Sequence, residues 1–316
     1  MILLIVPTDL HSRTKAFDFV FNHKFLSIRS FFPLIYINFG SKKDMIVYPN
    51  AKINIGLNIV SKRTDGYHNL ETVFYPIDLT DTLSVEKTSD TKTILITNGI
   101  KIEGNSEDNL VMKAYRLLEK DFKIPAVSMS LTKNIPSQAG LGGGSSDAAF
   151  TLKALNELFD LQLTDEQLET YASLLGADCP FFIKNKAVFA EGTGNIFTPL
   201  DLSLKKYYLL LVKPEVYIST KEAFQHVKPH APEKQLTSLL QMSPDKWKDN
   251  VKNDFEESVF PIHKSLPMIK KKLYDAGAVY ASMSGSGSSL YGLFTRPLKK
   301  AEDMFPHCFC RQIVLK

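Results

Sequence analysis

Residues 135–150 have the composition of a loop that could bind phosphate. They read IPSQAGLGGGSSDAAF, with four glycines within five residues directly before a helix-forming stretch. Because glycine has no Cβ, successive backbone N–H groups can converge on an anion in conformations that other residues resist. A helix N-terminus contributes further unpaired N–H groups and about half a positive charge. These residues therefore predict a site for the phosphates of a nucleotide.

The elements on either side of this loop should position it. Upstream, residues 127–132 (VSMSLT) alternate apolar and polar side chains, the pattern of a strand with one buried face. Downstream, apolar residues recur at helical spacing over residues 148–159, and Ser145 or Ser146 is suited to the N-cap. The alternative is a flexible connector that only makes a turn, but a connector seldom needs four glycines before a capped helix.

Phosphate loops of three other classes do not fit this stretch. A Walker loop needs Gly-Lys-Ser/Thr, and residues 135–150 contain no lysine. A Rossmann fingerprint needs a third glycine where Ser145 stands, and the catalytic-loop and magnesium motifs of protein kinases do not occur.

The loop resembles the signature Pro-x-x-x-Gly-Leu-Gly-x-Gly-Ser-Ser of the GHMP kinases, named for galactokinase, homoserine kinase, mevalonate kinase and phosphomevalonate kinase. That resemblance implies an ATP-dependent kinase of small alcohols, with ATP bound along the loop. The residues that match the signature or lie within it are Pro136, Ser137, Gln138, Ala139, Gly140, Leu141, Gly142, Gly143, Gly144, Ser145 and Ser146.

Further segments narrow the resemblance. PNAKINIGLNIVSKRTDGYHNLETVFYPIDLTDTL, GADCPFF, AEGTG and SGSGSS occur in the order expected for the GHMP kinases that act on cytidyl diphospho-methylerythritol, and the similarity covers essentially all of residues 45–316. One departure is Asn50, which stands where that pattern has proline but leaves Ala-Lys-x-Asn intact. The resemblance implies a two-domain α+β GHMP-kinase fold, with an N-terminal domain like domain 2 of ribosomal protein S5 and a C-terminal ferredoxin-like α/β sandwich.

Asp178 is the predicted general base. It follows the helix-ending Gly176, and Cys179 before Pro180 favours extended geometry, so the chain bends at this carboxylate. Phosphorylating an alcohol needs a group that accepts the hydroxyl proton, and the resemblance assigns that role to Asp178. Lys52 resembles its catalytic partner, an ammonium that keeps the aspartate ionised and offsets charge in the transition state. Taken alone, such an aspartate is usually a surface or capping residue and such a lysine is usually solvated.

The resemblance also implies where the substrate binds. A predicted Asp-Gly turn presents Tyr67 and His68, which in the resembling enzymes stack on and hydrogen-bond the cytosine of the substrate. Phe224 occupies the spacing of a second stacking aromatic, although a core phenylalanine is the commoner role. Asn54 lies on the same strand face as Lys52 by period 2, and we predict that it contacts the substrate.

Mg²⁺ is implied together with ATP, because phosphoryl transfer uses a metal that neutralises phosphate charge. The hydroxyls of Ser145 and Ser146 could reach it, but no ligand cluster in the sequence identifies its site, which stays unknown. A second glycine-serine loop, residues 284–289, folds against the active site in the resembling enzymes. By itself it could equally be a hairpin turn.

The composition limits the class of partner. The 316 residues are 44% apolar and 23% charged, and the net charge is +4. Residues 1–44 carry +3 of that charge, so the nearly neutral remainder argues against nucleic acid as the main partner. Three cysteines make no disulfide framework and suggest a reducing cytoplasm, and Cys308 with Cys310 makes a poor zinc site. The longest mostly apolar run near the N-terminus is too short to cross a membrane.

We predict an N-terminal ATP-binding domain over residues 45–200 and a C-terminal domain over residues 201–316. Residues 1–44 differ in composition and contain seven of the 21 phenylalanines. Our hypothesis is that Met45 is the biological start and that residues 1–44 are non-native. The alternative is a genuine extension that is disordered or acts in targeting. The oligomeric state does not follow from the sequence.

Three functions remain open at this point. The leading one is ATP-dependent phosphorylation of a cytidyl diphospho-methylerythritol in the non-mevalonate isoprenoid pathway. The second is a kinase of the same fold that acts on homoserine, mevalonate or another small alcohol. The third is a catalytically inactive nucleotide-binding module, against which the presence of both Lys52 and Asp178 argues.

Overall fold

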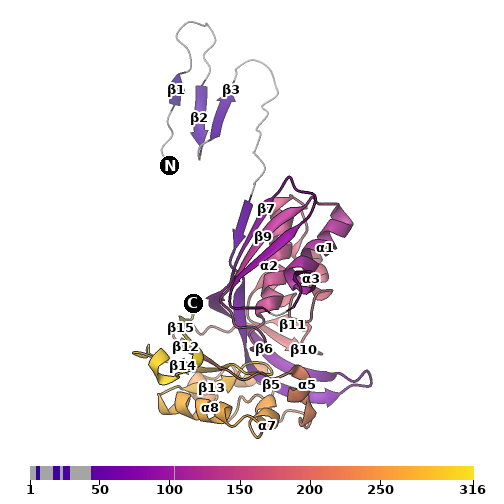
Figure 1. Ribbon diagram of the computed structural model, residues 1–316. Coiled ribbons are helices and arrows are strands. Elements are labelled where there is room, and N and C mark those ends of the chain that lie inside the picture. Colours follow the sequence, from indigo (N-terminus) through magenta and orange to yellow (C-terminus); the bar gives the residue numbers. More distant parts are fainter. Residues whose placement is uncertain (1–4, 8–16, 22–23, 29–43, 103) are drawn as a thin grey trace. The chain divides into compact units, whose positions relative to one another are not determined.

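The computed structural model of the chain is shown in Figure 1. The residues that it describes are 5–7, 17–21, 24–28, 44–102 and 104–316. They belong to two compact units, Met1–Lys42 and Lys43–Lys316.

In the first unit, the described residues form a small antiparallel sheet. Its strands, in spatial order, are β1 (Ile5–Pro7), β2 (Phe17–Phe21) and β3 (Lys24–Ile28). Of the predicted extension, residues 1–44, the structure describes only these three strands and residue 44. A biological start at Met45 therefore stays a prediction.

A four-stranded sheet opens the second unit. Its strands, in spatial order, are β4 (Asp44–Val47), β7 (Thr82–Lys87), β9 (Val127–Lys133) and β8 (Ile94–Gly99). β8 runs parallel to β9, and the other neighbouring pairs are antiparallel. Alternate residues of β9 are buried against the helices, which confirms the strand predicted over residues 127–132.

The first of these helices is α1 (Leu110–Phe122). The apolar spacing of residues 110–118 predicts this helix with a cap near Ser106; the helix is confirmed, and the predicted cap is wrong. Ser106 instead begins a 3-10 turn, η1 (Ser106–Asp108), and the side chain of Asn109 caps α1 by accepting a hydrogen bond from the backbone N–H of Val111 at 2.9 Å. An Asn side chain suits this position as well as Ser does.

The helix after the glycine loop is α2 (Gly143–Leu158), and its cap also differs from the prediction. Neither Ser145 nor Ser146 is the N-cap. Gly142 takes that position in the left-handed conformation, with φ +69°, which glycine adopts without a steric penalty. The glycine loop therefore leads directly into the helix, and both serines lie in its first turn.

Two shorter helices complete this part of the chain. α3 (Asp165–Ser173) opens with a capping box, which the spacing Thr164-x-x-Gln167 predicts and the hydrogen bonds between these two residues confirm. It ends at Ser173 rather than at Gly176, because the chain tightens into a turn before the glycine. α4 (Phe181–Lys184) follows the turn that carries Asp178.

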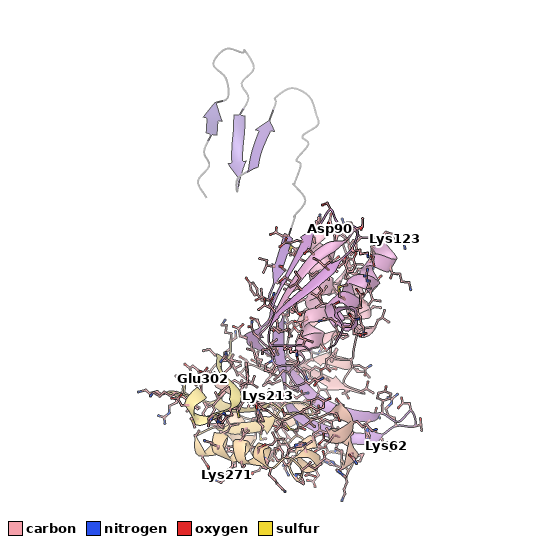
Figure 2. The ribbon with its side chains drawn as sticks, in the orientation of Figure 1. Lys62, Asp90, Lys123, Lys213, Lys271 and Glu302 are labelled. Atoms are coloured by element: carbon pink, nitrogen blue, oxygen red, sulfur yellow. The ribbon has the colours of Figure 1, made fainter. Side chains whose placement is uncertain are left out.

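A long hairpin runs through the second unit. Its strands β5 (Asn50–Lys62) and β6 (His68–Thr80) each have 13 residues and pair antiparallel with three irregularities in register. β10 (Val188–Glu191) and β11 (Ile196–Pro199) extend the sheet beyond β6. Lys62 lies near the tip of the hairpin (Figure 2).

The C-terminal part is an antiparallel sheet with helices around it (Figure 1). Its strands, in spatial order, are β13 (Tyr280–Met283), β14 (Leu290–Phe294), β12 (Tyr208–Pro214) and β15 (Cys308–Val314). The helical elements are α5 (Thr220–Gln225), α6 (Leu236–Leu239), η2 (Pro244–Lys246), α7 (Phe255–Val259), α8 (Ser265–Asp275) and η3 (Glu302–Met304). The mixed α+β architecture agrees with the predicted fold class. A domain boundary near Leu200 stays a prediction, because residues 43–316 form one compact unit.

Among the residues that the structure describes, no helix combines the length and the apolar character that crossing a membrane would require.

Candidate active site

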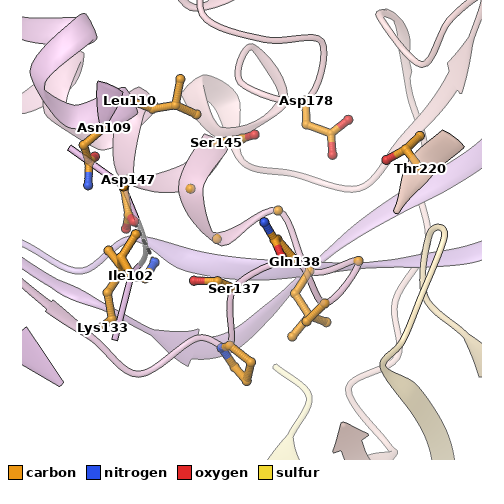
Figure 3. A pocket seen from close by; sticks show the side chains of 18 of the residues that line it. Ile102, Asn109, Leu110, Lys133, Ser137, Gln138, Ser145, Asp147, Asp178 and Thr220 are labelled. Carbon is orange, nitrogen blue, oxygen red and sulfur yellow. Dashed lines mark hydrogen bonds and ion pairs between the residues drawn. The ribbon is translucent and has the colours of Figure 1, made fainter. Parts of the chain in front are cut away.

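Two cavities meet at the glycine loop. The first, of about 820 Å³, runs along the loop, and the second, of about 590 Å³, lies between β5, the β5–β6 turn and α5. Figure 3 shows the first cavity, with Lys133 and Asp147 at one end and Asp178 and Thr220 at the other. The residues that line both cavities are Gly140, Gly142, Asp178, Thr220 and Ser286. A group transferred from a ligand in one cavity to a ligand in the other would pass through this junction.

Of the predicted ATP-binding residues, those from Pro136 through Ser145 line the first cavity. Ser146 is buried and does not line it. Gly140 has φ +74°, and a Cβ there would collide with the backbone carbonyl of Ser284. A Cβ on Gly142 would come within 2.9 Å of the Phe182 ring. The loop thus uses glycine both for left-handed backbone and for close packing.

The second glycine-serine loop, residues 284–289, packs against the first one. The Ser284 hydroxyl donates a hydrogen bond to the carbonyl of Gly140 at 2.8 Å, and the backbone N–H of Ser289 donates to the carbonyl of Ala139 at 3.2 Å. The Ser284 hydroxyl also accepts from the backbone N–H of Asn54 at 3.1 Å. This loop therefore connects β5 and the phosphate loop to the C-terminal sheet, which a simple hairpin turn would not do.

Lys52 and Asp178, the predicted catalytic pair, lie together at the junction. The Lys52 Nζ is 3.3 Å from the Asp178 Oδ2; the lysine side chain is 5% exposed and the aspartate side chain 35% exposed. Lys52 also donates to the Asn54 Oδ1 at 2.7 Å and lies 4.4 Å from the centroid of the Phe74 ring. A buried ammonium beside a carboxylate that reaches open space can stabilise negative charge while the carboxylate takes a proton.

Asn54 is almost fully buried and lines the second cavity. Its Oδ1 accepts from Lys52, and its Nδ2 donates to the Thr72 hydroxyl at 3.0 Å. These contacts make Asn54 a positioning residue for the Lys52 ammonium. A contact with the substrate, which we predicted, stays a prediction.

The predicted substrate residues Tyr67, His68 and Phe224 all line the second cavity. The rings of His68 and Phe224 stack with their centroids 4.7 Å apart and an angle of 16° between their planes, and Tyr67 is exposed. Burial, together with the nearby charge of Lys62, lowers the pKa of His68 below its usual value. A neutral imidazole has one donor and one acceptor nitrogen, which suits recognition of a nucleobase edge.

One cluster at the site was not predicted from the sequence. Lys133 forms ion pairs with Asp81 and with Asp147, whose Oδ2 is 2.6 Å away, and all three side chains are buried. Asp81 also accepts hydrogen bonds from the backbone N–H groups of Asn134 and Ile135 at 2.5 and 2.8 Å. Lys133 continues the buried alternation of β9, so a lysine at an apolar position of a strand was the signal that could have revealed the cluster.

Asp147 is the carboxylate of this cluster that accepts fewer hydrogen bonds. Its Oδ1 has no hydrogen-bond partner among the described residues, whereas Asp81 has three donors. Burial raises the pKa of Asp147 to about 7 against the opposing effect of the Lys133 charge. One ammonium does not neutralise two carboxylates, and the nearby Asp81 carboxylate also raises the pKa of Asp147.

Comparisons with known proteins agree with this arrangement. Models of the GHMP kinases N terminal domain and of the GHMP kinases C terminal match residues 109–186 and 234–307. A 4-diphosphocytidyl-2-C-methyl-D-erythritol kinase of Bacteroides fragilis is 57% identical over 274 residues, which cover 86% of this chain and 100% of the relative. A kinase of the same name from Bacteroides thetaiotaomicron is 58% identical over 252 residues, which cover 79% of this chain and 92% of that relative.

A solved structure gives the same result. The crystal structure of a 4-(cytidine 5'-diphospho)-2C-methyl-D-erythritol kinase is similar with a TM-score of 0.75 and 31% identity, covering 86% of this chain and 99% of that one. The chain therefore belongs to the 4-diphosphocytidyl-2-C-methyl-D-erythritol kinase family of the GHMP kinases.

Proposed function

We propose that this protein transfers the γ-phosphoryl group of ATP to the 2-hydroxyl of 4-diphosphocytidyl-2-C-methyl-D-erythritol, giving the 2-phosphate and ADP. The observation that carries the proposal is the position of Lys52 and Asp178 at the junction of two cavities, one along a phosphate-binding loop and one beside an aromatic cluster. The reaction belongs to the non-mevalonate isoprenoid pathway, in which the family acts.

Asp178 is the general base of this reaction. Its carboxylate accepts the proton of the 2-hydroxyl while the hydroxyl oxygen forms a bond to the γ-phosphorus and the bond from that phosphorus to the ADP oxygen breaks. The Lys52 ammonium, 3.3 Å away, stabilises the negative charge on the attacking oxygen. The backbone N–H groups of the loop from Ser137 to Ser145, which lines the first cavity, bind the phosphates.

Mg²⁺ is part of the proposal because ATP reacts as its magnesium complex. Oxygen ligands suit this ion, and Ser145 and Asp147 both line the cavity along the phosphate loop. Among the described residues, the Asp147 Oδ1 has no hydrogen-bond partner. Within the described part of the chain, however, no group of three or more His, Cys, Asp or Glu side chains could hold a metal ion. The ATP phosphates and water would therefore supply most of its ligands, and the ion would neutralise phosphate charge.

The second cavity is the proposed site of the cytidyl substrate. Tyr67, His68 and Phe224 would contact the cytosine ring by stacking and hydrogen bonds. Asn54 would contact the reacting alcohol, since it lines the cavity beside Lys52.

The free state of Cys179, Cys308 and Cys310 supports a cytoplasmic location.

An assay of the purified protein with ATP and a panel of alcohols tests the function. We expect turnover of the cytidyl substrate and none of homoserine or mevalonate, and the reverse result would make the protein a kinase of another alcohol. Asp178→Asn should lower kcat by about 10²- to 10⁴-fold, the usual contribution of a general base, with ATP affinity nearly unchanged. A variant with the activity of the wild type would remove Asp178 from the mechanism and would reopen the question of an inactive module.

A further inference from the structure

The second cavity has few positive charges for a substrate that carries a diphosphate. Its charged lining residues are Lys52, Asp178 and Lys221. Lys52 is paired with Asp178 and hydrogen-bonded to Asn54. Lys221 is exposed and forms no ion pair or hydrogen bond with any residue that the structure describes. Among the described residues, it is therefore the one lining cation that has no partner in the protein.

The position of Lys221 along α5 (Thr220–Gln225) matches the order of groups in such a substrate. It directly follows Thr220, which lines both cavities at the site of transfer. It precedes by three residues Phe224, which stacks on His68 at the nucleobase end. Residues three apart on a helix lie on the same face, so the Lys221 ammonium can reach the space between these ends. In a cytidine diphosphate ester, the diphosphate lies between the base and the alcohol.

We infer that Lys221 binds the diphosphate of the cytidyl substrate and so selects a diphosphate ester over an uncharged nucleoside or a simple alcohol. The inference rests on the proposed function. An ammonium forms a charge-assisted hydrogen bond with a phosphate oxygen, and its long flexible stem lets it follow the ligand. Lys221 lines the second cavity and not the first, so its charge acts on the alcohol substrate and not on ATP.

Cytidine and CDP, which differ only in the diphosphate, are the probes for this inference. Their dissociation constants are measured by calorimetry with the wild type, Lys221→Met and Lys221→Arg. We expect Lys221→Met to weaken CDP binding by about 5- to 20-fold, the range for a charged hydrogen bond at a partly solvated site. Cytidine binding should change less than about twofold, and Lys221→Arg should restore most of the CDP affinity. In turnover, KM for the cytidyl substrate should rise while KM for ATP stays constant.

Lys228→Met is the matched control, because Lys228 is an exposed lysine a few residues further on that does not line this cavity. It should leave both affinities unchanged. Equal losses of cytidine and CDP affinity in Lys221→Met would mean a structural role, and no loss of either would mean no role; both results overturn the inference. If the wild type neither binds CDP nor turns over the cytidyl substrate, the proposed function fails as well.

Discussion

At the scale of single residues, a chain of hydrogen bonds sets the position of the Lys52 ammonium. Lys52 donates to Asn54, Asn54 donates to the Thr72 hydroxyl, and Thr72 donates to the carbonyl of Gly56 at 2.5 Å. Because the Lys52 ammonium can only donate, the Asn54 amide must turn its oxygen toward Lys52 and its NH2 group toward Thr72. The ammonium is thus held beside Asp178 before any substrate binds, which lowers the cost of organising the site for reaction.

The buried carboxylate of Asp147 should make stability depend on pH. Its pKa is raised to about 7 in the folded protein, whereas in the unfolded chain it is near the ordinary value of about 3.9. Between these values the folded state holds a proton that the unfolded state has lost, so stability is highest at low pH and falls as pH rises to about 7. We expect Asp147→Asn to lack this decline. The free energy of unfolding of the wild type, relative to the variant, should fall by about 2.5 kcal/mol from pH 5 to pH 8.

Urea denaturation at pH 5, 6, 7 and 8 measures this difference. Asp201→Asn is the control, since Asp201 is exposed and the structure gives it no ion pair among the described residues. Its pH dependence should follow that of the wild type. Parallel pH profiles for the wild type and Asp147→Asn would show that Asp147 is ionised throughout, and the proposed distribution of charge in the cluster would be wrong.

At the scale of elements, the two glycine loops hold each other in place. Gly140 has a positive φ, and its Cα faces the Ser284 carbonyl so closely that no side chain fits between them. Gly140→Ala should therefore destabilise the fold by about 2 kcal/mol or more through backbone strain and displacement of the second loop. The same displacement should weaken ATP binding. Denaturant titration measures the first effect and calorimetry with ATP the second.

Gly144 provides the matched control within the same motif. It lies in the first turn of α2, its φ is not positive, and the nearest atom to an added Cβ is the Leu110 Cδ1 at 3.8 Å. Because alanine favours helix over glycine, Gly144→Ala should stabilise the fold by up to about 1 kcal/mol. Equal destabilisation by both substitutions would mean that the loop tolerates no side chain anywhere, and that the contact with Ser284 is not the cause.

At the scale of the molecule, one apolar cluster spans the predicted boundary near residue 200. Ile53 and Ile55 of β5 share it with Leu209 of β12 and with Trp247, all of them completely buried. Removing the residues on either side of this boundary would expose the apolar side chains of the other side to water. The second unit should therefore unfold as one body although its sequence contains two family domains.

The single tryptophan of the chain, Trp247, makes this prediction testable. Its fluorescence reports on the C-terminal part, and far-ultraviolet circular dichroism reports on the secondary structure of the whole chain. We expect Ile55→Ala, a change in β5, to lower the stability seen by Trp247 by about 2 to 5 kcal/mol, as expected for a large-to-small core substitution. Ile46→Ala, at an exposed position of β4, should have little effect. Separate transitions by the two methods would contradict a shared core.

Much of the site could be predicted because its chemistry lies in short continuous motifs. The glycine loop, Ala-Lys-x-Asn and the turn around Asp178 each carry a local backbone conformation, and the strands at residues 82–87 and 127–132 follow local alternation. The helix caps were less accessible, because Ser, Asn and Gly can all serve at an N-cap and nearby residues compete for it. Asn109 and Gly142 take these positions in the structure.

By itself, the sequence determined the class of chemistry and the residues that could perform it, since both depend on residue type and on local spacing along the chain. Only the tertiary structure decided which of them meet. It brought Lys52 within 3.3 Å of Asp178 across 126 positions, joined Lys133 to Asp81 and Asp147, and turned Lys221 toward the second cavity. The physical reason is that an ion pair or a cavity depends on distance in space, and distance between elements is set by how their buried faces pack.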